Sequence, residues 1–221
     1  MIPPIWHPSA NFGERRVGAV LELVVIHYTA MDSAAAALAR LCDPAFEVSA
    51  HYLIGCDGTC WQMVADEMRA WHAGAGQWGG RGDVNSRSIG IELDNRGDHP
   101  FSEPQMAVLE ALLARILAEH GIAPEGVIGH SDMAPVRKFD PGVRFDWRRL
   151  AGQGLSVWSE GSGMTAGAWA DHAARFGYGV DDSDMGVVVQ AFRDRFRPGA
   201  VGPVCDADVA VMADLAMRYP A

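Results

Sequence analysis

The apolar run at residues 20–28 constrains the fold most. It reads Val-Leu-Glu-Leu-Val-Val-Ile-His-Tyr, and Glu22 is the only acidic residue in it. A strand whose residues do not alternate between apolar and polar is typical of a sheet that is covered on both faces. The run therefore predicts a central β-strand, with His27 near its carboxyl end.

Further strands and helices are expected to alternate along the chain. The apolar periodicity predicts helices at 34–41 and about 103–120, and strands at 51–56, 60–64, 88–93 and 126–128. Ser102 is the expected N-cap of the longer helix, and Gly121 its end. The glycine-rich segment 71–87 is expected to be a long loop. This order predicts an α/β fold: a mixed central β-sheet with helices on both faces.

The composition changes after residue 150. Residues 151–163 are rich in Gly and Ser, as flexible linkers are, and the pattern beyond them predicts short helices. We therefore predict a domain at 1–150, a linker at 151–163 and a small C-terminal three-helix bundle at 164–221.

Charge argues against a nucleic-acid partner, and the distribution of apolar residues argues against a membrane. The chain has 28 acidic and 18 basic residues, a net charge of -10 and no basic block, so a nucleic acid would be repelled. It has no run of 18 apolar residues, and its first 16 residues lack the apolar stretch of a signal peptide. We predict no nucleic acid or membrane partner and a cytoplasmic location, with the periplasm as the alternative. The oligomeric state stays open.

The cysteines are expected to be free. A chain without an export signal favours buried thiols over disulfides. Cys56 and Cys60 flank a predicted hairpin tip, where two cysteines could face each other closely enough to bridge. Whether that pair is bridged stays open.

Two separate segments carry side chains that bind metal ions. His27 lies near the end of the apolar run, and the stretch Gly-His-Ser-Asp-Met-Ala-Pro-Val-Arg-Lys-Phe-Asp-Pro-Gly at 129–142 contains His130, Lys138 and Asp140. Two imidazole nitrogens and a carboxylate oxygen are zinc ligands, and three protein ligands leave a fourth position for water. Hydrolysis is therefore the leading reaction class. Lys138, the only lysine of the chain, could face the same pocket.

The sequence is similar to a known family in three places. His-Tyr-Thr at 27–29, Ser-Ile-Gly-Ile-Glu at 88–92 and the stretch 129–142 resemble the zinc N-acetylmuramoyl-L-alanine amidases, over about residues 6–150. The resemblance implies the same α/β architecture and one Zn²⁺ per chain. It also implies hydrolysis of the amide between N-acetylmuramic acid, or its 1,6-anhydro form, and the L-alanine of a stem peptide. Peptidoglycan fragments and muropeptides would be the partners. Part of the C-terminal region resembles a peptidoglycan-binding module.

Five residues are expected to act on the substrate. Glu92 is the expected base, because a strand carboxylate among apolar neighbours has a raised pKa and can accept a proton from water. Lys138 is the expected oxyanion stabiliser. His72 matches a family segment that lines the cleft, and we expect it to contact substrate together with Trp71 and Asn85.

Other polar residues near these motifs have plainer explanations. His51 is expected to make structural hydrogen bonds. Asp132, beside His130, could orient a metal ligand or simply form a turn.

Two other functions compete with the amidase. One is a non-catalytic peptidoglycan-recognition protein of the same fold, and the other is a zinc hydrolase of another N-acyl peptide. Recognition proteins typically lack a zinc ligand. Because His27, His130 and Asp140 are all present, with Glu92 and Lys138, the sequence favours the enzyme.

Overall fold

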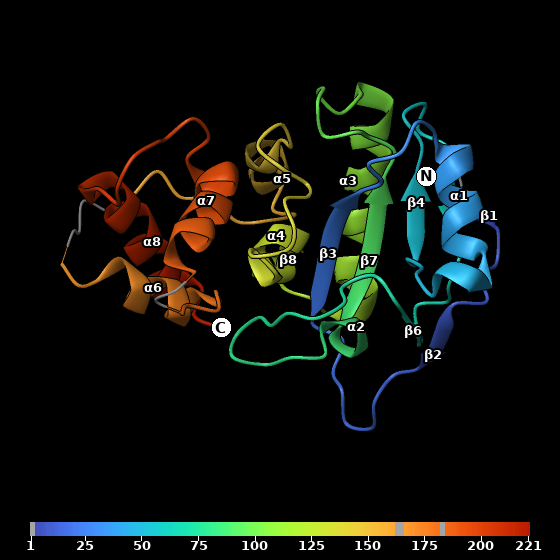
Figure 1. Cartoon of the computed structure of the whole chain (residues 1–221), viewed down its shortest axis with the longest axis horizontal. Helices are drawn as coiled ribbons and strands as arrows, with labels where there is room; N and C mark the ends of the chain where they lie inside the picture. The colour runs from blue at the N-terminus through green and yellow to red at the C-terminus, as the bar shows by residue number, and fades with distance from the viewer. Residues whose placement is uncertain (1–2, 162–165, 182–183) are drawn as a thin grey trace.

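A six-stranded mixed β-sheet organises the first part of the chain (Figure 1). The computed structural model describes residues 3–161, 166–181 and 184–221. The strands are β1 (Ile5–Trp6), β3 (Leu23–Tyr28), β4 (Tyr52–Ile54), β5 (Cys60–Gln62), β7 (Ser88–Leu93) and β8 (Val127–Gly129). Their order is β1-β5-β4-β7-β3-β8, and only the β4–β5 hairpin is antiparallel. A separate pair is formed by β2 (Phe12–Glu14) and β6 (Met68–Ala70).

Helices cover both faces of the sheet, as predicted. They are α1 (Ala34–Cys42), α2 (Val84–Arg87), α3 (Glu103–His120), α4 (His130–Met133), α5 (Trp147–Gly152), α6 (Trp169–Phe176), α7 (Met185–Phe196) and α8 (Asp206–Arg218). The Ser102 hydroxyl accepts a hydrogen bond from the Gln105 N–H at the start of α3, and Gly121 ends this helix with φ of 65°. Both predicted ends of the long helix are confirmed.

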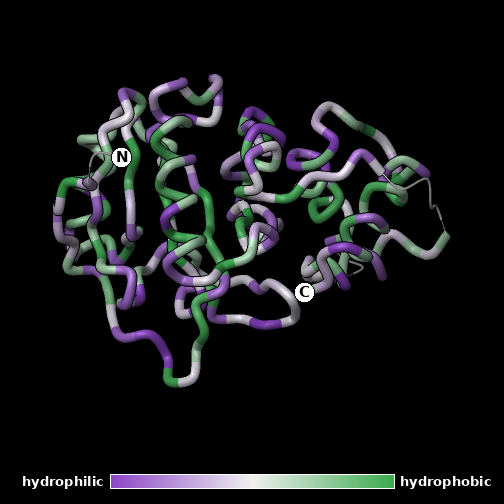
Figure 2. The backbone as a smooth tube through the Cα atoms, turned by 180° about the vertical axis from the view of Figure 1, so that it is seen from behind, coloured by the Kyte–Doolittle hydropathy of each residue, from purple (hydrophilic) through white to green (hydrophobic). Residues whose placement is uncertain are grey.

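The two faces of β3 carry different side chains, because successive residues of a strand point to opposite sides. Val24 and Ile26 pack with α3 on one face. Leu23, Val25 and His27 lie on the other. Figure 2 shows hydrophobic segments running along these central strands. In the register of β3 and β7, His27 lies beside Glu92. One face of the sheet therefore presents polar side chains at its carboxyl edge.

Several predicted segments differ from the structure. The strands expected at 51–56 and 60–64 are shorter, at Tyr52–Ile54 and Cys60–Gln62. The central strand begins at Leu23 rather than residue 20. The segment 71–87 is a loop over most of its length, but its last four residues form the short helix α2. The buried Arg87 guanidinium donates to the carbonyls of Trp78, Arg81 and Gly82 and so holds the loop folded back onto this helix. Side-chain bonds of this kind cannot be read from periodicity.

Helices α6, α7 and α8 form the predicted three-helix bundle. They lie to one side of the sheet, beyond α4 and α5 (Figure 1). Residues of the bundle share one apolar cluster with residues of β3 and β8: Trp169, Phe176, Val188 and Phe192 with Leu23, Val25 and Ile128. Within the predicted linker, Leu155, Ser156, Val157 and Ser159 are buried. Residues 162–163 lie outside the described part. The division into domains stays a prediction. The first part of the predicted linker, however, is packed against the rest of the protein.

A buried ion pair also joins the bundle to the sheet. Arg195 of α7 donates to the Asp132 carboxylate of α4 at 2.6 Å and to the Val127 carbonyl of β8 at 2.9 Å. The Tyr178 hydroxyl donates to the same carboxylate at 2.6 Å, and so does the Gly129 N–H at 2.8 Å. Asp132 therefore closes the turn that contains His130 and connects this turn to the bundle.

Arg195→Met should destabilise the protein strongly. Both side chains of the pair are at most 2% exposed, so the substitution leaves the Asp132 charge buried without its counter-charge. Removing one partner of a buried pair costs about 3–5 kcal/mol, and chemical denaturation would measure the free energy of unfolding. The control is Arg148→Met, because Arg148 pairs with Glu160 in solvent. We expect that change to cost about 0–1 kcal/mol. Equal losses would contradict the structural role given to Arg195.

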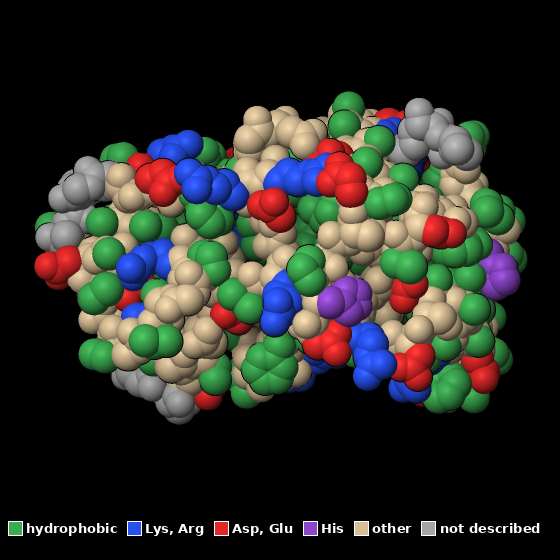
Figure 3. Space-filling model, turned by 90° about the horizontal axis from the view of Figure 1, so that it is seen from above, with side chains coloured by type: hydrophobic (Ala, Val, Ile, Leu, Met, Phe, Trp, Pro, Cys, Tyr) green, Lys and Arg blue, Asp and Glu red, His purple; other side chains and the backbone are tan. Residues whose placement is uncertain are grey.

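The surface carries charges of both signs. Figure 3 shows acidic and basic side chains next to one another on the face it presents. Within the described ranges, no helix combines the length and apolar character needed to cross a membrane. All four cysteines are free, including Cys56 and Cys60. The expectation of buried thiols is wrong for Cys56 and Cys205, which are exposed because Cys56 lies in a surface turn and Cys205 precedes the first turn of α8.

Candidate metal centre and active site

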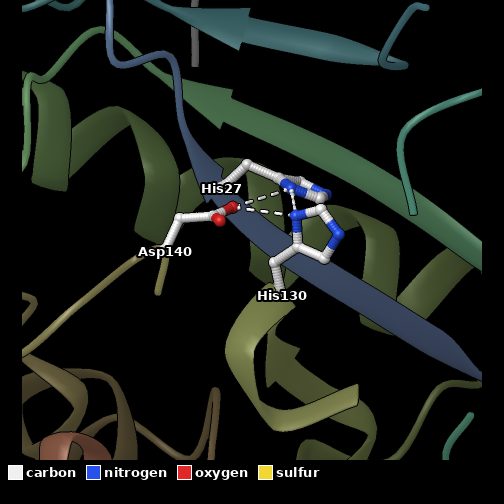
Figure 4. A group of neighbouring side chains, drawn as sticks. All are labelled: His27, His130 and Asp140. Carbon is white, nitrogen blue, oxygen red and sulfur yellow. Dashed lines mark hydrogen bonds and ion pairs between the residues drawn. The ribbon is translucent and has the colours of Figure 1, made fainter. Parts of the chain in front are cut away.

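The three predicted metal ligands converge at one edge of the sheet (Figure 4). His27 is near the end of β3, His130 follows the neighbouring strand β8 as the first residue of α4, and Asp140 lies in the next loop. The Nδ1 atoms of His27 and His130 are 2.9 Å apart. Each lies 3.0 Å from Oδ2 of Asp140. Parallel neighbouring strands bring these distant residues together, because their carboxyl ends meet at one edge.

Hydrogen bonds orient the His130 ring. Its Nε2 lies 2.9 Å from the Ala73 carbonyl oxygen, which can only accept, so Nε2 carries the proton. The Nδ1 lone pair of His130 therefore faces His27 and Asp140. Arg137 donates to the same Ala73 carbonyl at 2.7 Å and also to the Ala75 carbonyl. Arg137 therefore fixes the loop at residues 73–75, whose Ala73 carbonyl orients the His130 ring.

The protonation states of the cluster favour a cation. Burial lowers the pKa of His27 to about 4, and the nearby His130 adds to this effect, so the ring is neutral at neutral pH. Burial alone would raise the pKa of Asp140, but the His130 and His27 rings hold it well below its ordinary value. With the His130 proton on Nε2, three close acceptor atoms share at most one proton. Such atoms repel one another unless a positive charge lies among them.

Zinc suits this donor set. Two neutral imidazoles and one carboxylate are the ligands of many catalytic zinc sites, which leave a further position for substrate or water. A second group of possible ligands among the described residues consists of Asp66, Glu119 and His120. It suits a cation less well, because Arg115 already pairs with Glu119 and His120 with Asp66.

A cavity of about 380 Å³ opens beside the three ligands. Its lining includes Trp71, His72, Glu92, Arg137, Lys138 and Phe139. The structure therefore places both predicted catalytic residues, and two of the three predicted substrate contacts, around one space with the metal ligands.

Glu92 has the surroundings of a proton acceptor. Its Oε2 is buried and has no hydrogen-bond partner among the described residues. Burial raises the pKa of Glu92 to about 8, the negative Asp140 adds to the rise, and Lys138 opposes it. A carboxylate with such a pKa can take up a proton and release it near neutral pH. Lys138 lines the same cavity, and no ion pair occupies its ammonium group in the described part of the chain.

Asn85 lies behind the cavity wall rather than in it. Its Oδ1 accepts hydrogen bonds from the N–H groups of His72 at 3.1 Å and Ala73 at 2.8 Å, and the residue is 7% exposed. This geometry gives Asn85 the role of holding the loop, and it offers no support for the predicted substrate contact. Trp71 and His72 do line the cavity, so contact with substrate stays a prediction for both.

His51 makes the structural hydrogen bonds expected of it. Its Nδ1 accepts from the Gly90 N–H at 3.0 Å, and its Nε2 lies 3.1 Å from the Met68 carbonyl. Sequence reasoning assigned no role to Arg137 or Ser88. Arg137 donates to the Ala73 carbonyl that orients His130, and the Ser88 hydroxyl contacts the His72 ring beside His27. Alternation along 88–92 could have found Ser88, since it faces the same side as Glu92.

A cluster of this kind, set at the carboxyl edge of an α/β sheet and next to a buried glutamate, is a candidate metal centre of the type that hydrolytic enzymes use. The sequence profile of the family described as N-acetylmuramoyl-L-alanine amidase matches residues 17–143. The chain belongs to the N-acetylmuramoyl-L-alanine amidase family.

One relative matches well beyond this region, and others match over about half of the chain. N-acetylmuramoyl-L-alanine amidase AmiD of Escherichia coli is 35% identical over 227 residues, which cover 88% of this chain and 81% of AmiD. The 1,6-anhydro-N-acetylmuramyl-L-alanine amidase AmpD of Enterobacter cloacae is 41% identical over 103 residues, covering 47% of this chain and 55% of AmpD.

Solved structures include the C-terminal helices in the match. The complex of E. coli AmiD with anhydro-N-acetylmuramic acid-L-Ala-D-gamma-Glu-L-Lys has a TM-score of 0.82 and 32% identity, and covers 95% of this chain and 98% of that one. AmpDh3 from Pseudomonas aeruginosa in complex with anhydromuramic pentapeptide has a TM-score of 0.81 and 31% identity, and covers 96% of each chain. The predicted fold class and the family resemblance are both confirmed.

Proposed function

We propose that this enzyme is a zinc-dependent amidase that separates N-acetylmuramic acid, or its 1,6-anhydro form, from the L-alanine of a stem peptide. The observation that carries the proposal is the convergence of His27, His130 and Asp140 beside Glu92 in one cavity. Muropeptide ligands in the AmiD and AmpDh3 structures support the substrate class.

Each side chain around the cavity has its own role in the proposed reaction. His27, His130 and Asp140 would hold the ion, and zinc acidifies water and polarises a carbonyl when it is bound. Glu92 takes the proton from the attacking water and passes it to the leaving amide nitrogen. Lys138 donates to the carbonyl oxygen as negative charge develops there. A C–O bond forms and the C–N bond breaks, which yields a lactyl carboxylate and a peptide with a free amino group.

The rate should fall on the acid side of neutral pH. Glu92 can act as a base only after it loses its proton, and burial raises its pKa from the ordinary 4.5 to about 8. The positive charge of a bound zinc ion lowers that value, so we expect the acid limb of kcat/KM between these two limits. Steady-state rates measured from pH 4 to 10 would locate it, and a limb at the pKa of an ordinary exposed glutamate would contradict the assignment.

Lys138→Met gives the matched test of this limb. Because the Lys138 charge opposes the rise in the pKa of Glu92, its removal should move the acid limb to higher pH and lower kcat. A lower kcat with an unmoved limb would mean that Lys138 does not act on Glu92 through its charge.

Metal content and cleavage should be measured on the same preparation. Elemental analysis is combined with release of stem peptide from a defined muropeptide, once with ordinary muramic acid and once with the 1,6-anhydro form. One zinc ion per chain with release of peptide supports the amidase. Zinc binding without cleavage of either muropeptide, but with cleavage of another acylated peptide, favours the broader hydrolase. A folded protein that lacks both zinc and cleavage is better described as a recognition protein.

Several partner predictions rest on the sequence alone. A cytoplasmic location, the absence of nucleic acid and membrane partners and a wall-binding role for the bundle stay predictions. Fractionation of cells and binding of the whole chain to purified peptidoglycan would test the first and the last.

A further inference from the structure

A row of hydrogen bonds leads from the metal centre into the protein on the side away from Asp140. The Nε2 atom of His27 lies 3.0 Å from Nδ1 of His72. The Nε2 atom of His72 lies 3.2 Å from the Ser88 hydroxyl oxygen. That hydroxyl lies 2.6 Å from the Val84 carbonyl oxygen. The row therefore runs from a predicted metal ligand to a backbone group of α2.

The position of each proton follows from the last member of the row. The Val84 carbonyl can only accept, so Ser88 donates its single proton to it. The Ser88 oxygen must then accept from His72, which places the His72 proton on Nε2. In a neutral His72 ring, Nδ1 then carries no proton and can only accept a hydrogen bond. Because Nδ1 of His72 faces Nε2 of His27, the His27 Nε2 atom must carry the proton that is donated. The Nδ1 lone pair of His27 is then directed at His130 and Asp140.

Close packing holds the His72 ring in this place. Gly90 of β7 lies beside the ring, and a Cβ atom there would lie 2.4 Å from Cγ of His72. No side chain fits at that distance, because Cγ is too near the backbone to move away. Glycine at position 90 thus lets His72 lie between β7 and His27, which explains a glycine in the middle of a buried strand.

The same contacts argue against a contact role for the polar atoms of His72. Both ring nitrogens already have partners within the protein, so a hydrogen bond to substrate would break one of them. The ring still forms part of the cavity lining.

We propose that His72 and Ser88 are positioning residues that keep the proton of His27 on Nε2 and so leave its Nδ1 free to bind the metal ion. The metal part of this inference rests on the proposed function. The proton arrangement does not, because it exists in the metal-free protein. Outer partners of metal-bound histidines are known to set ring orientation and basicity.

The metal-free protein provides the first test. Long-range ¹H–¹⁵N NMR of the ring nitrogens should show the His27 proton on Nε2 in wild type. In His72→Phe the acceptor is lost, and the proton should move to Nδ1, where Asp140 can accept it. In His72→Asn the amide oxygen is as many bonds from the backbone as Nδ1 and can still accept, so we expect the wild-type arrangement. A wild-type His27 protonated on Nδ1 would overturn the proposal.

Zinc affinity provides the second test, by competition with a chelator. We expect His72→Phe and Ser88→Ala to weaken affinity by about 10- to 100-fold, and His72→Asn to keep most of it. Gly90→Ala should weaken it as well, because it displaces the ring while retaining every hydrogen-bonding group. Gly13→Ala is the matched control, since a Cβ atom at this strand glycine meets nothing within 4 Å.

The outcomes separate this inference from the proposed function. If wild type binds zinc and cleaves muropeptide, but His72→Phe and Gly90→Ala bind zinc as tightly, only the positioning role is wrong. If wild type binds no zinc, the proposed function fails, and the NMR spectra still decide the proton arrangement. Circular dichroism identifies any variant that fails to fold, and the remaining variants then carry the comparison.

Discussion

Glu92→Gln should lower kcat by about 100- to 10,000-fold, the usual contribution of a general acid or base. The amide has nearly the shape of the carboxylate but cannot accept the proton from water. Because Glu92 is not one of the three converging ligands, the variant should keep one zinc ion per chain. Turnover of a defined muropeptide and elemental analysis of the same sample would measure both effects.

A control and a stability measurement complete this experiment. Glu14→Gln is the matched control, because Glu14 also lies on a strand but is exposed, and we expect it to leave the rate unchanged. The unfolding temperature of Glu92→Gln should stay near that of wild type, since the Oε2 atom it changes has no partner to lose. A rate within tenfold of wild type, with zinc bound, would rule out Glu92 as the base.

Asp140→Ala should abolish both tight zinc binding and turnover. Asp140 is the one acidic residue among the three candidate ligands, and its Oδ2 lies 3.0 Å from a nitrogen of each histidine. Mutating a residue that hydrogen-bonds to a metal ligand lowers metal affinity by up to roughly 100-fold. Removing the Asp140 carboxylate itself should lower zinc affinity by more than that. Competition with a chelator would measure the loss of affinity.

Zinc should also stabilise wild type but not this variant. At a zinc concentration of 100 times Kd, binding to the folded state contributes about 2.7 kcal/mol, which raises Tm by roughly 5–10 °C in a chain of this size. Asp140→Ala should show little of this shift. The control is His120→Ala, which removes a member of the second group of possible ligands. If His120→Ala loses the zinc-dependent shift and Asp140→Ala keeps it, the ion binds at the second group.

Much of the fold could be predicted because local signals were strong. An apolar run predicted β3, alternating side chains predicted β7, and Ser102 and Gly121 predicted the two ends of α3. Each of these signals depends only on residues that are close together in the chain. The candidate metal ligands could be proposed for the same reason: His27 lies near the end of a buried strand, and His130 and Asp140 lie within one motif.

Other features depend on contacts between distant segments. Asn85 looks from its sequence like a polar loop residue free to bind substrate, yet its side chain accepts hydrogen bonds from two backbone N–H groups at the opposite end of the same glycine-rich segment. The predicted linker looked solvated because it is rich in Gly and Ser, but Leu155 and Val157 are buried. No local pattern could predict that Arg195 pairs with Asp132 across 63 positions of sequence.

The sequence by itself determined the class of fold, the family and the residues able to bind a metal ion, because strand periodicity and motif chemistry are local properties. Only the tertiary structure decided how those residues are prepared for their work. The Ala73 carbonyl places the proton of His130, and burial beside Asp140 raises the pKa of Glu92 to about 8. Proton positions and pKa values depend on which atoms lie within a few ångströms, and folding alone brings those atoms together.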